Sequence, residues 1–391
     1  MSKILFIFER DMPTISIMRE IYKNLAGYKE IQPDFQYLTD VTPFMVDSHD
    51  VIVLLRPNDV YSWKIAKSAH KAGHTVVTFC DDDLLNLPGN SPTIPWRKKG
   101  LLKALRQSDV IWSSSRWILQ KYNSLTAGGR TALQNTVIQP SELEGVGFHE
   151  SNSGIVKIVY AAAPSHVSLF ERFITPVTSK LADEFGDRIQ FTFISVHPNV
   201  EKVGCSYLNG MPLDEYRRYM REQQFDIGVA PLNNDDFSKC KYFNKFIEYT
   251  TQGTVGVYSN VEPYSYVVKD KVNGFLCDDT PESWYQALRT AINEKGLRKT
   301  CLENAVGFLR TNLSEKAVMD SVVKDIPEFL NADGSYEGCS GFGLVRLKYF
   351  LSKPFDWAYL VLYNLKKKGV GGLVKQIKSH FKEAKAYRRR K

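Results

Sequence analysis

Short apolar runs recur along the first half of the chain and alternate with segments of helical period. The runs predict buried strands at 3–8 (KILFIF), 51–55, 75–79 and 110–114, and around 136–138. Apolar residues at helical spacing lie between them, at roughly 15–25, 61–72, 96–106 and 117–123. Strands that alternate with helices in this way indicate a parallel α/β sheet.

The same alternation begins again after a short polar segment, HESNSG (149–154), which is typical of a linker. Strands are predicted at 155–162, 190–196, 226–232 and 255–259, and helices at 169–185, 213–223, 241–252 and 281–293. The fold class is therefore α/β with two Rossmann-like domains. We expect an N-terminal domain at 1–150, a second at 151–330, and a linker with a basic helical C-terminal extension at 331–391.

The strongest candidate site lies in the second domain, where a strand, a polar loop, a helix and a glycine follow one another. Asp236 or Ser238 is expected to cap a helix that carries Lys241, Lys245 and Glu248 on one face, because these three are spaced by four and three residues. Two cations near a helix N-terminus and beyond a strand's carboxyl end suit a diphosphate, and the carboxylate suits ribose hydroxyls. A solvated surface helix with charge pairs is the alternative.

The run K-x-x-x-K-x-x-E-Y-x-x-x-G, from Lys241 to Gly253, resembles the donor-binding segment of GT-B glycosyltransferases of the family-four type. The resemblance implies that a nucleotide-sugar donor is held mainly by the second domain. Glu248 would bind the ribose, and Lys241 and Lys245 would lie near the diphosphate or the sugar, with Lys245 also catalytic. Cys240 stands where the family often has a first glutamate. The resemblance further implies donor contacts from Ser165, Tyr249, Asn260, Pro263 and Tyr264.

A second segment also resembles the family, at the start of the second domain. After the strand at 155–162, small residues allow a ligand to approach the backbone, and Ser165 and His166 open a helix. The resemblance places phosphates at this loop. Because the arginine of many members is absent, His166 and backbone N–H groups would replace it, and we count His166 among the catalytic residues. The loop 197–199 resembles the family's nucleobase-side loop.

In the N-terminal half, the candidates are Arg19, Arg56 and the run Asp81-Asp82-Asp83. Arg56 and the aspartates directly follow predicted strands, at the edge where open α/β sheets bind ligands. Three adjacent carboxylates repel one another and need partners: a metal, acceptor hydroxyls, a helix end or Arg56. We assign Arg19, Arg56, Asp82 and Asp83 to the acceptor side, with Arg56 paired to one aspartate. The D-x-D spacing of Asp81 and Asp83 leaves a metal site as a minor alternative, and we expect no metal.

Charge separates the tail from the rest of the chain. The 391 residues carry a net charge of +8, but residues 340–391 alone hold fourteen Lys and Arg against two acidic residues, which makes +12 and leaves −4 for the first 339. An overall composition of 43% hydrophobic and 24% charged residues excludes a disordered, collagenous or coiled-coil chain. Six widely spaced cysteines and the absence of a signal-like start favour a cytoplasmic protein.

The tail pattern predicts an amphipathic helix in which Leu373, Ile377 and Phe381 share one face. Basic residues occupy the other face, namely Lys375, Lys378, Lys382 and Lys385. Such a helix suits an anionic membrane surface. Trp357 and Tyr363, which suit the membrane–water interface, and the flexible basic stretch predicted at 366–372 point the same way. The alternative is that residues 350–365 pack on the N-terminal domain.

From these features we expect a metal-independent, hexosyltransferase-like enzyme without a cofactor. It would move a sugar from a nucleotide-diphosphate donor to a polysaccharide or lipid-linked saccharide acceptor, at the inner face of the membrane, with no nucleic-acid partner. Two alternatives remain open: a non-hydrolysing nucleotide-sugar epimerase, and a catalytically silent sugar-binding partner.

Overall fold

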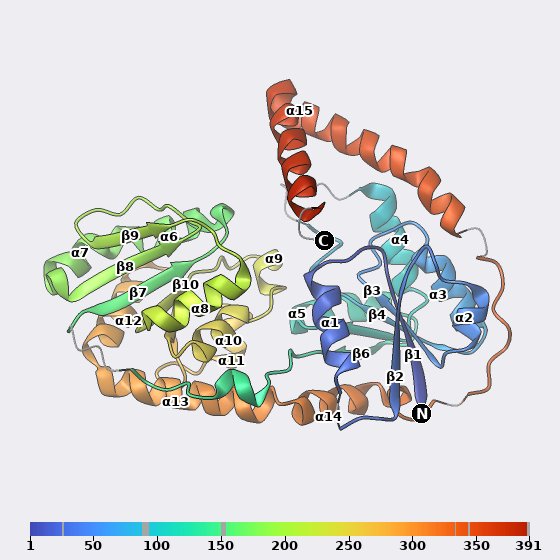
Figure 1. The fold of residues 1–391 in the computed structure, drawn as a ribbon, viewed down its shortest axis with the longest axis horizontal. Coiled ribbons are helices and arrows are strands. Elements are labelled where there is room, and N and C mark those ends of the chain that lie inside the picture. The colour runs from blue at the N-terminus through green and yellow to red at the C-terminus, as the bar shows by residue number, and fades with distance from the viewer. Residues whose placement is uncertain (26, 88–93, 150–153, 333, 343–344, 389–391) are drawn as a thin grey trace. The chain divides into compact units, whose positions relative to one another are not determined.

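The computed structural model describes residues 1–25, 27–87, 94–149, 154–332, 334–342 and 345–388, with the backbone alone for 345, 368 and 372–388. Its contacts divide the chain into two compact units (Figure 1). Unit 1 comprises Met1–Ser113, Ile118–Ala132 and Val323–Lys391, and unit 2 comprises Ser114–Trp117 and Leu133–Val322. Each unit is described by itself below.

Unit 1 is built on a six-stranded sheet with strand order β2-β1-β3-β4-β5-β6. The strands are β1 (Ser2–Phe8), β2 (Ile31–Tyr37), β3 (Val51–Leu55), β4 (Thr75–Phe79), β5 (Val110–Ser113) and β6 (Arg130–Leu133). Strand β1 pairs in parallel with β2 and β3, and β4 with β3 and β5. The helices are α1 (Pro13–Lys23), α2 (Pro43–Asp47), α3 (Ser62–Lys71), α4 (Pro95–Leu105), α5 (Arg116–Tyr122), η1 (Asn123–Leu125), η5 (Pro327–Phe329) and α15 (Val345–Arg388).

The continuous apolar runs are explained by burial on both faces of the sheet. Every residue of β3 is at most 2% exposed, as are residues 4–8 of β1. The strand β2 was not predicted, because its sequence IQPDFQY is polar and contains a proline, as edge strands do. The predicted strand at 136–138 is wrong: the sixth strand is β6, and residues 134–139 form no regular element.

Unit 2 repeats the architecture, with strand order β12-β11-β10-β7-β8-β9 and parallel pairing throughout. Its strands are β7 (Val156–Ala161), β8 (Ile189–Ile194), β9 (Gly204–Leu208), β10 (Ile227–Ala230), β11 (Val255–Ser259) and β12 (Phe275–Cys277). Its helices are η2 (Pro140–Leu143), η3 (Pro164–His166), α6 (Val167–Phe173), α7 (Thr175–Phe185), η4 (Gly186–Arg188), α8 (Leu213–Gln223), α9 (Asp236–Lys239), α10 (Asn244–Thr251), α11 (Tyr264–Val267), α12 (Pro281–Asn293) and α13 (Lys295–Asn312). Helix α14 (Glu315–Asp325) leads from unit 2 to unit 1.

Two predicted helices of unit 2 differ from the structure, one because it is divided and one because it begins later. The helix predicted at 169–185 breaks into α6 and α7, and Pro176 stands at the start of α7, where its missing N–H costs no helical bond. The helix predicted at 241–252 is also wrong in its first turn. Asp235, rather than Asp236 or Ser238, caps the short α9 by accepting from the Ser238 N–H at 2.8 Å. Lys241 then lies in the turn before α10.

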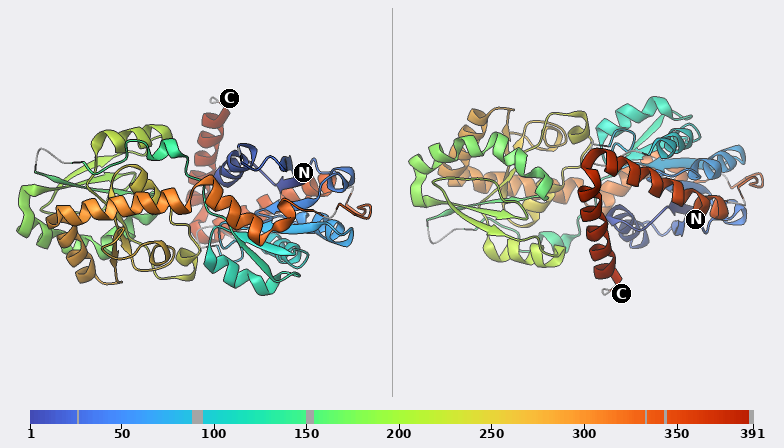
Figure 2. Two further views of the ribbon diagram at one scale, coloured as in Figure 1. Left: turned by 90° about the horizontal axis from the view of Figure 1, so that it is seen from below. Right: turned by 90° about the horizontal axis from the view of Figure 1, so that it is seen from above.

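The C-terminal segment belongs to unit 1. Helix α15 runs from residue 345 to 388 and bends at Gly369, whose φ of 65° is not helical (Figures 1 and 2). Residues 366–372 were predicted to be flexible. In the structure they are helical before and after the bend at Gly369. Phe342 and Tyr349 are 2% and 7% exposed in the core around β3 and α3, which supports the predicted alternative that the tail packs on the N-terminal domain. Among the residues that the structure describes, no helix combines the length and the apolar content needed to cross a bilayer.

The division into units differs from the predicted domain boundaries. The contacts assign residues from Leu133 onward to unit 2 and residues from Val323 onward to unit 1. The linker predicted at 149–154 stays a prediction, since residues 150–153 lie outside the described part of the chain.

Candidate functional site

The order of strands in unit 2 marks one edge of its sheet as a binding position. Strand β7 lies between β8 on one side and β10 on the other, so the connections after β7 and β10 leave the sheet in opposite directions. A crevice outside the carboxyl ends of two such strands is where open α/β sheets bind ligands. The connection after β7 carries His166, and the one after β10 leads to Lys241 and Lys245.

These three basic side chains come together at that edge. Burial lowers the pKa of His166, and the charges of Lys241 and Lys245 lower it further. Each lysine therefore lies within electrostatic range of His166, although the residues come from segments 75 and more residues apart. The lowered pKa leaves His166 neutral near pH 7. The prediction that Lys241 shares a helical face with Lys245 is wrong, but the two still converge on His166.

Glu248, on α10, is held by two neighbours. It forms an ion pair with Lys245, and the Tyr216 hydroxyl donates a hydrogen bond to the same carboxylate oxygen. The side chains of Lys245 and Glu248 are 25% and 26% exposed, so both stay accessible to a ligand. Burial raises the pKa of Tyr264, and the nearby Glu248 raises it further, so that this hydroxyl stays protonated beside the carboxylate.

Tyr249 does not take part in the accessible site. Its side chain is fully buried, and its hydroxyl donates to the Val229 carbonyl oxygen at 2.9 Å. A Cβ atom on Gly228 would lie 2.6 Å from the Tyr249 ring, so the glycine makes room for it against the sheet. Tyr249 therefore lies in the core, and the donor contact that the resemblance implies for it stays a prediction.

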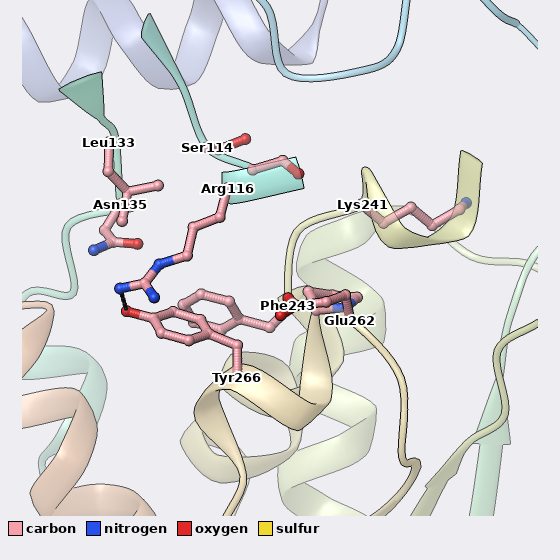
Figure 3. A pocket seen from close by; sticks show the side chains of 10 residues that line it. Ser114, Arg116, Leu133, Asn135, Lys241, Phe243, Glu262 and Tyr266 are labelled. Carbon is pink, nitrogen blue, oxygen red and sulfur yellow. Dashed lines mark hydrogen bonds between the residues drawn. The ribbon is translucent and has the colours of Figure 1, made fainter. Parts of the chain in front are cut away.

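A pocket of unit 2 extends this site beyond Lys241 (Figure 3). It is lined by Ser114, Ser115, Arg116, Leu133, Asn135, Lys241, Phe243, Glu262, Pro263 and Tyr266. The Arg116 guanidinium lies 3.6 Å from the centroid of the Tyr266 ring and donates to its hydroxyl. Burial raises the pKa of Glu262, and Arg116 opposes that shift. The pocket thus places a cation, a carboxylate and aromatic surface next to Lys241.

Arg116, Glu262 and Tyr266 were not among the predicted site residues. Arg116 follows β5 by three residues, and Glu262 follows β11 by three. The rule that ligands lie beyond the carboxyl ends of strands would have indicated both, because each occupies the first residues after a strand.

The remaining predicted donor residues occupy loops of unit 2. Ser165 is exposed in η3, and Pro263 lines the pocket. The Asn260 side chain donates to Asp278 at 2.9 Å. In the predicted nucleobase-side loop, the ring of His197 is stacked on that of Tyr207, with the centroids 5.4 Å apart.

In unit 1, the sheet has its own reversal of strand order, where β1 lies between β2 and β3. Arg56 follows β3 and forms ion pairs with Asp81 and Asp82, the latter at 3.0 Å, so the predicted pairing to one aspartate involves two. Asp83 points elsewhere: its buried carboxylate accepts from the Lys121 ammonium at 2.6 Å and from the Tyr122 hydroxyl at 2.7 Å. The carboxylate of Asp83 is therefore engaged within unit 1, and its assignment to the acceptor side stays a prediction.

A second pocket lies at this reversal, lined by Phe8, Glu9, Arg10, Met12, Ile15, Leu55, Arg56, Asn58, Leu84 and Arg97. The other acceptor-side candidate, Arg19, lies beside it on α1. Arg19 is 3.6 Å from Asp11 and its guanidinium lies over the rings of Phe8 and Phe35. Unit 1 therefore offers a polar pocket in which Arg56, Arg97 and Glu9 are each held in ion pairs.

One group of three potential metal ligands lies close together among the described residues, namely Asp47, His74 and Cys339, with ligand atoms within 4.8 Å of one another. Burial and then a hydrogen bond to Asp47 raise the pKa of the Cys339 thiol to about 12. A thiol must lose its proton to bind a metal, and here the carboxylate accepts that proton's hydrogen bond instead. None of the three residues lines either pocket.

No protein-family model matches the sequence, and no curated protein is detectably similar to it. Solved structures do match its fold. Anabaena HepE in complex with UDP and glucose has a TM-score of 0.56 at 12% identity, covering 84% of this chain and 100% of HepE. The lipopolysaccharide outer core galactosyltransferase WaaB has a TM-score of 0.57 at 12% identity, covering 83% and 99%.

A third match is an alpha-glucosyltransferase in complex with UDP-glucose and DNA containing an abasic site. It has a TM-score of 0.53 at 11% identity, covering 84% of this chain and 100% of that one. At these identities the likeness concerns the fold. Two parallel six-stranded sheets with flanking helices, matched along the full length of glycosyltransferases, show that this chain has the Rossmann-like GT-B fold, as the sequence predicted.

Proposed function

We propose that the protein is a glycosyltransferase that takes a sugar from a nucleotide-diphosphate donor and passes it to a saccharide acceptor. The observation that carries this proposal is the convergence of His166, Lys241, Lys245 and Glu248 outside the carboxyl ends of β7 and β10. Cations suited to a diphosphate lie beside a carboxylate suited to ribose hydroxyls, at the position where this type of sheet binds nucleotides.

The reaction assigned to this site is electrostatic and positional. As the bond between the sugar and the diphosphate breaks, negative charge grows on the leaving phosphate, and the fixed ammonium groups of Lys241 and Lys245 stabilise it. Glu248 accepts hydrogen bonds from the ribose and thereby sets the position of the donor. Tyr216 keeps the Glu248 carboxylate in place through its own hydrogen bond. Neutral His166 donates or accepts a hydrogen bond at the phosphates or the sugar.

The matched structures suggest which donors to try first. HepE was solved with UDP and with UDP-glucose, and the alpha-glucosyltransferase with UDP-glucose. UDP-linked hexoses therefore head the panel, followed by GDP- and ADP-linked sugars. On the acceptor side we propose a growing polysaccharide or a lipid-linked saccharide, bound at the pocket beside Arg56.

The test is donor binding by Glu248→Gln, measured by calorimetry against the panel. Loss of the charged acceptor for two ribose hydroxyls removes about 1.5–3 kcal/mol per hydrogen bond, so we expect roughly 100-fold weaker binding. The control is Glu222→Gln on α8, which removes an exposed carboxylate of the same unit that forms an ion pair with Arg218 at 3.9 Å. Equal donor affinity of Glu248→Gln and the control would refute the proposed site.

Two other functions make different products from the same donor. An epimerase converts the nucleotide sugar to its epimer without an acceptor, so chromatography of the donor after incubation with the protein alone separates that reaction. A silent sugar-binding partner releases no nucleotide under any condition. Acceptor-dependent release of nucleotide is the outcome that the proposed transferase predicts.

A further inference from the structure

Helix α15 has two faces of opposite character before its bend at Gly369. One face packs on unit 1 through Tyr349, Asp356 and Asn364, which are 6–7% exposed. The other face carries large apolar side chains that remain in contact with solvent. Because the helix is anchored along one side, its exposed apolar face points in a fixed direction. An exposed apolar face of this kind indicates a binding surface.

The inner face is anchored by charged and aromatic contacts. Asp356 accepts from the Trp96 indole at 2.7 Å and from the Arg97 guanidinium at 2.6 Å. Glu9, which directly follows β1, accepts from the Tyr349 hydroxyl at 2.8 Å and from Lys353 at 2.7 Å. These bonds join α15 to β1 and α4 and determine which residues of the helix face outward.

The outer face is a stripe of six side chains that are 55–68% exposed: Leu347, Phe350, Leu351, Phe355, Trp357 and Leu362. Leu347, Leu351, Phe355 and Leu362 are spaced by four and seven residues and share one side of a helix with 3.6 residues per turn, and Phe350 and Trp357, seven residues apart, lie together on its flank. With Val370, they are seven of the fifteen large apolar side chains that are exposed among the described residues. Apolar exposure is thus concentrated on this short stretch of helix.

The charge around the stripe indicates what covers it. Arg346, Lys348 and Lys366 are exposed on the same helix, and residues 340–391 carry a net charge of +12 in the sequence. Two copies that met through this face would bring two such charges together, which opposes self-association. An anionic bilayer accepts both features, because apolar side chains enter its interface while Lys and Arg pair with lipid headgroups.

We infer that the outer face of α15, from Leu347 to Leu362, docks on an anionic membrane surface. This differs from the helix predicted at 373–391: the docking face lies before the Gly369 bend and is built from the anchored part of the helix. The side chains of Leu373, Ile377 and Phe381 lie outside the described residues.

The inference deepens the proposed function and rests on it in one respect, the nature of the acceptor. Glu9 and Arg97, which hold the inner face of α15, also line the pocket of unit 1. The same two residues therefore contact the docking helix and line the pocket. A saccharide whose lipid anchor lies in the bilayer under α15 is thereby brought next to that pocket, which specifies a lipid-linked acceptor.

The experiment measures sedimentation of the full-length protein with phosphatidylcholine vesicles, with or without phosphatidylglycerol. The variant is Leu351→Ser/Phe355→Ser/Leu362→Ser, and the matched control is Ile17→Ser/Phe44→Ser/Leu213→Ser, which changes exposed apolar side chains on α1, α2 and α8. We expect the wild type and the control to bind vesicles that contain phosphatidylglycerol, and the variant to bind at least about tenfold less, since its three serines cannot enter the apolar part of the interface.

Equal binding of the variant and the control would overturn the inference, as would an absence of vesicle binding by the wild type. Light scattering after gel filtration tests the competing occupant: a dimer that the variant converts to a monomer would assign the face to a second copy of the chain. Because vesicle binding needs no nucleotide sugar, Glu248→Gln should bind vesicles normally. A wild-type protein that binds the donor but no vesicles refutes the docking face alone, and a wild-type protein that binds vesicles but no donor refutes the proposed function alone.

Discussion

The two units have the same kind of sheet, yet the edges where their strand order reverses differ in charge balance. In unit 2, Lys241 and Lys245 lie near neutral His166, and Glu248 is the carboxylate paired with Lys245. In unit 1, Arg56 is matched by Asp81 and Asp82, and Arg97 by Glu9 and Asp356. The proposed function accordingly assigns an anionic ligand to the edge of unit 2 and a neutral, hydroxyl-rich one to the edge of unit 1.

The difference lies in what each edge needs in order to be stable without a ligand. The guanidinium of Arg56 and the carboxylate of Asp81 are 17% and 20% exposed and neutralise each other, so the edge of unit 1 is complete by itself. The lysines of unit 2 are left with excess positive charge, which a bound diphosphate would neutralise. The following three predictions test that contrast.

The largest effect is expected from removing the excess charge of unit 2. Lys241→Ala/Lys245→Ala should weaken binding of UDP, or of the nucleotide of the preferred donor, by roughly 1,000-fold, because each charge-assisted bond contributes about 1.5–3 kcal/mol. Calorimetry at constant ionic strength measures this. The contrast fails if the double variant binds the nucleotide within a factor of about three of the wild type.

A smaller effect, on stability rather than affinity, is expected from unbalancing unit 1. Arg56→Met leaves Asp81 and Asp82 without their cation, in a place where burial already raises the pKa of Asp81 against the opposing effect of Arg56. Discounting the partial exposure of these side chains, we expect a loss of about 2 kcal/mol in the free energy of unfolding. Urea denaturation followed by circular dichroism measures it. Nucleotide affinity should stay unchanged, and a parallel loss of affinity would contradict the separation of roles.

The smallest effect concerns the protonation of His166. Burial and the two lysines hold its pKa below the usual value, and a bound diphosphate would raise it again. A group whose pKa rises on binding takes up a proton, so donor affinity should increase severalfold as the pH falls from about 7.5 to about 5.5. His166→Asn should flatten this dependence. A slope that survives in the variant would assign the titration to Glu262 in the neighbouring pocket, whose pKa burial raises.

The sequence was most informative where one physical requirement acts alone. The bounds of β3, β11 and α12 are those that were predicted, because the apolar pattern of each segment fits only one type of secondary structure. The first turn of the helix predicted at 241–252 is wrong, and Phe243, which precedes α10, is buried at 4% exposure outside any helix. Helical spacing is a local property of the sequence, whereas the burial of a side chain depends on residues that are distant in sequence.

The site was predicted in part for the same reason. Lys245 and Glu248 lie on one short helix, so their relation can be derived from spacing. The proximity of His166 to both lysines was expected only through the resemblance, and Arg116 and Tyr266 meet across 150 residues of sequence. Such pairs depend on strand order, which the sequence pattern leaves undetermined. The outer face of α15 was missed because residues 366–372 suggested a flexible break that would have separated two shorter segments.

The division of unit 1 between two distant stretches of sequence has a consequence for biosynthesis. Phe329 packs edge-on against Tyr22 and Trp112, so the aromatic core of the first 132 residues is closed by a side chain from the far end of the chain. Unit 2, which is nearly continuous in sequence, is translated in between. At roughly 5–20 residues per second, the nascent first unit waits on the order of ten seconds or more with this surface uncovered. A segment that is translated after unit 2 therefore completes the core of the unit that was begun before it.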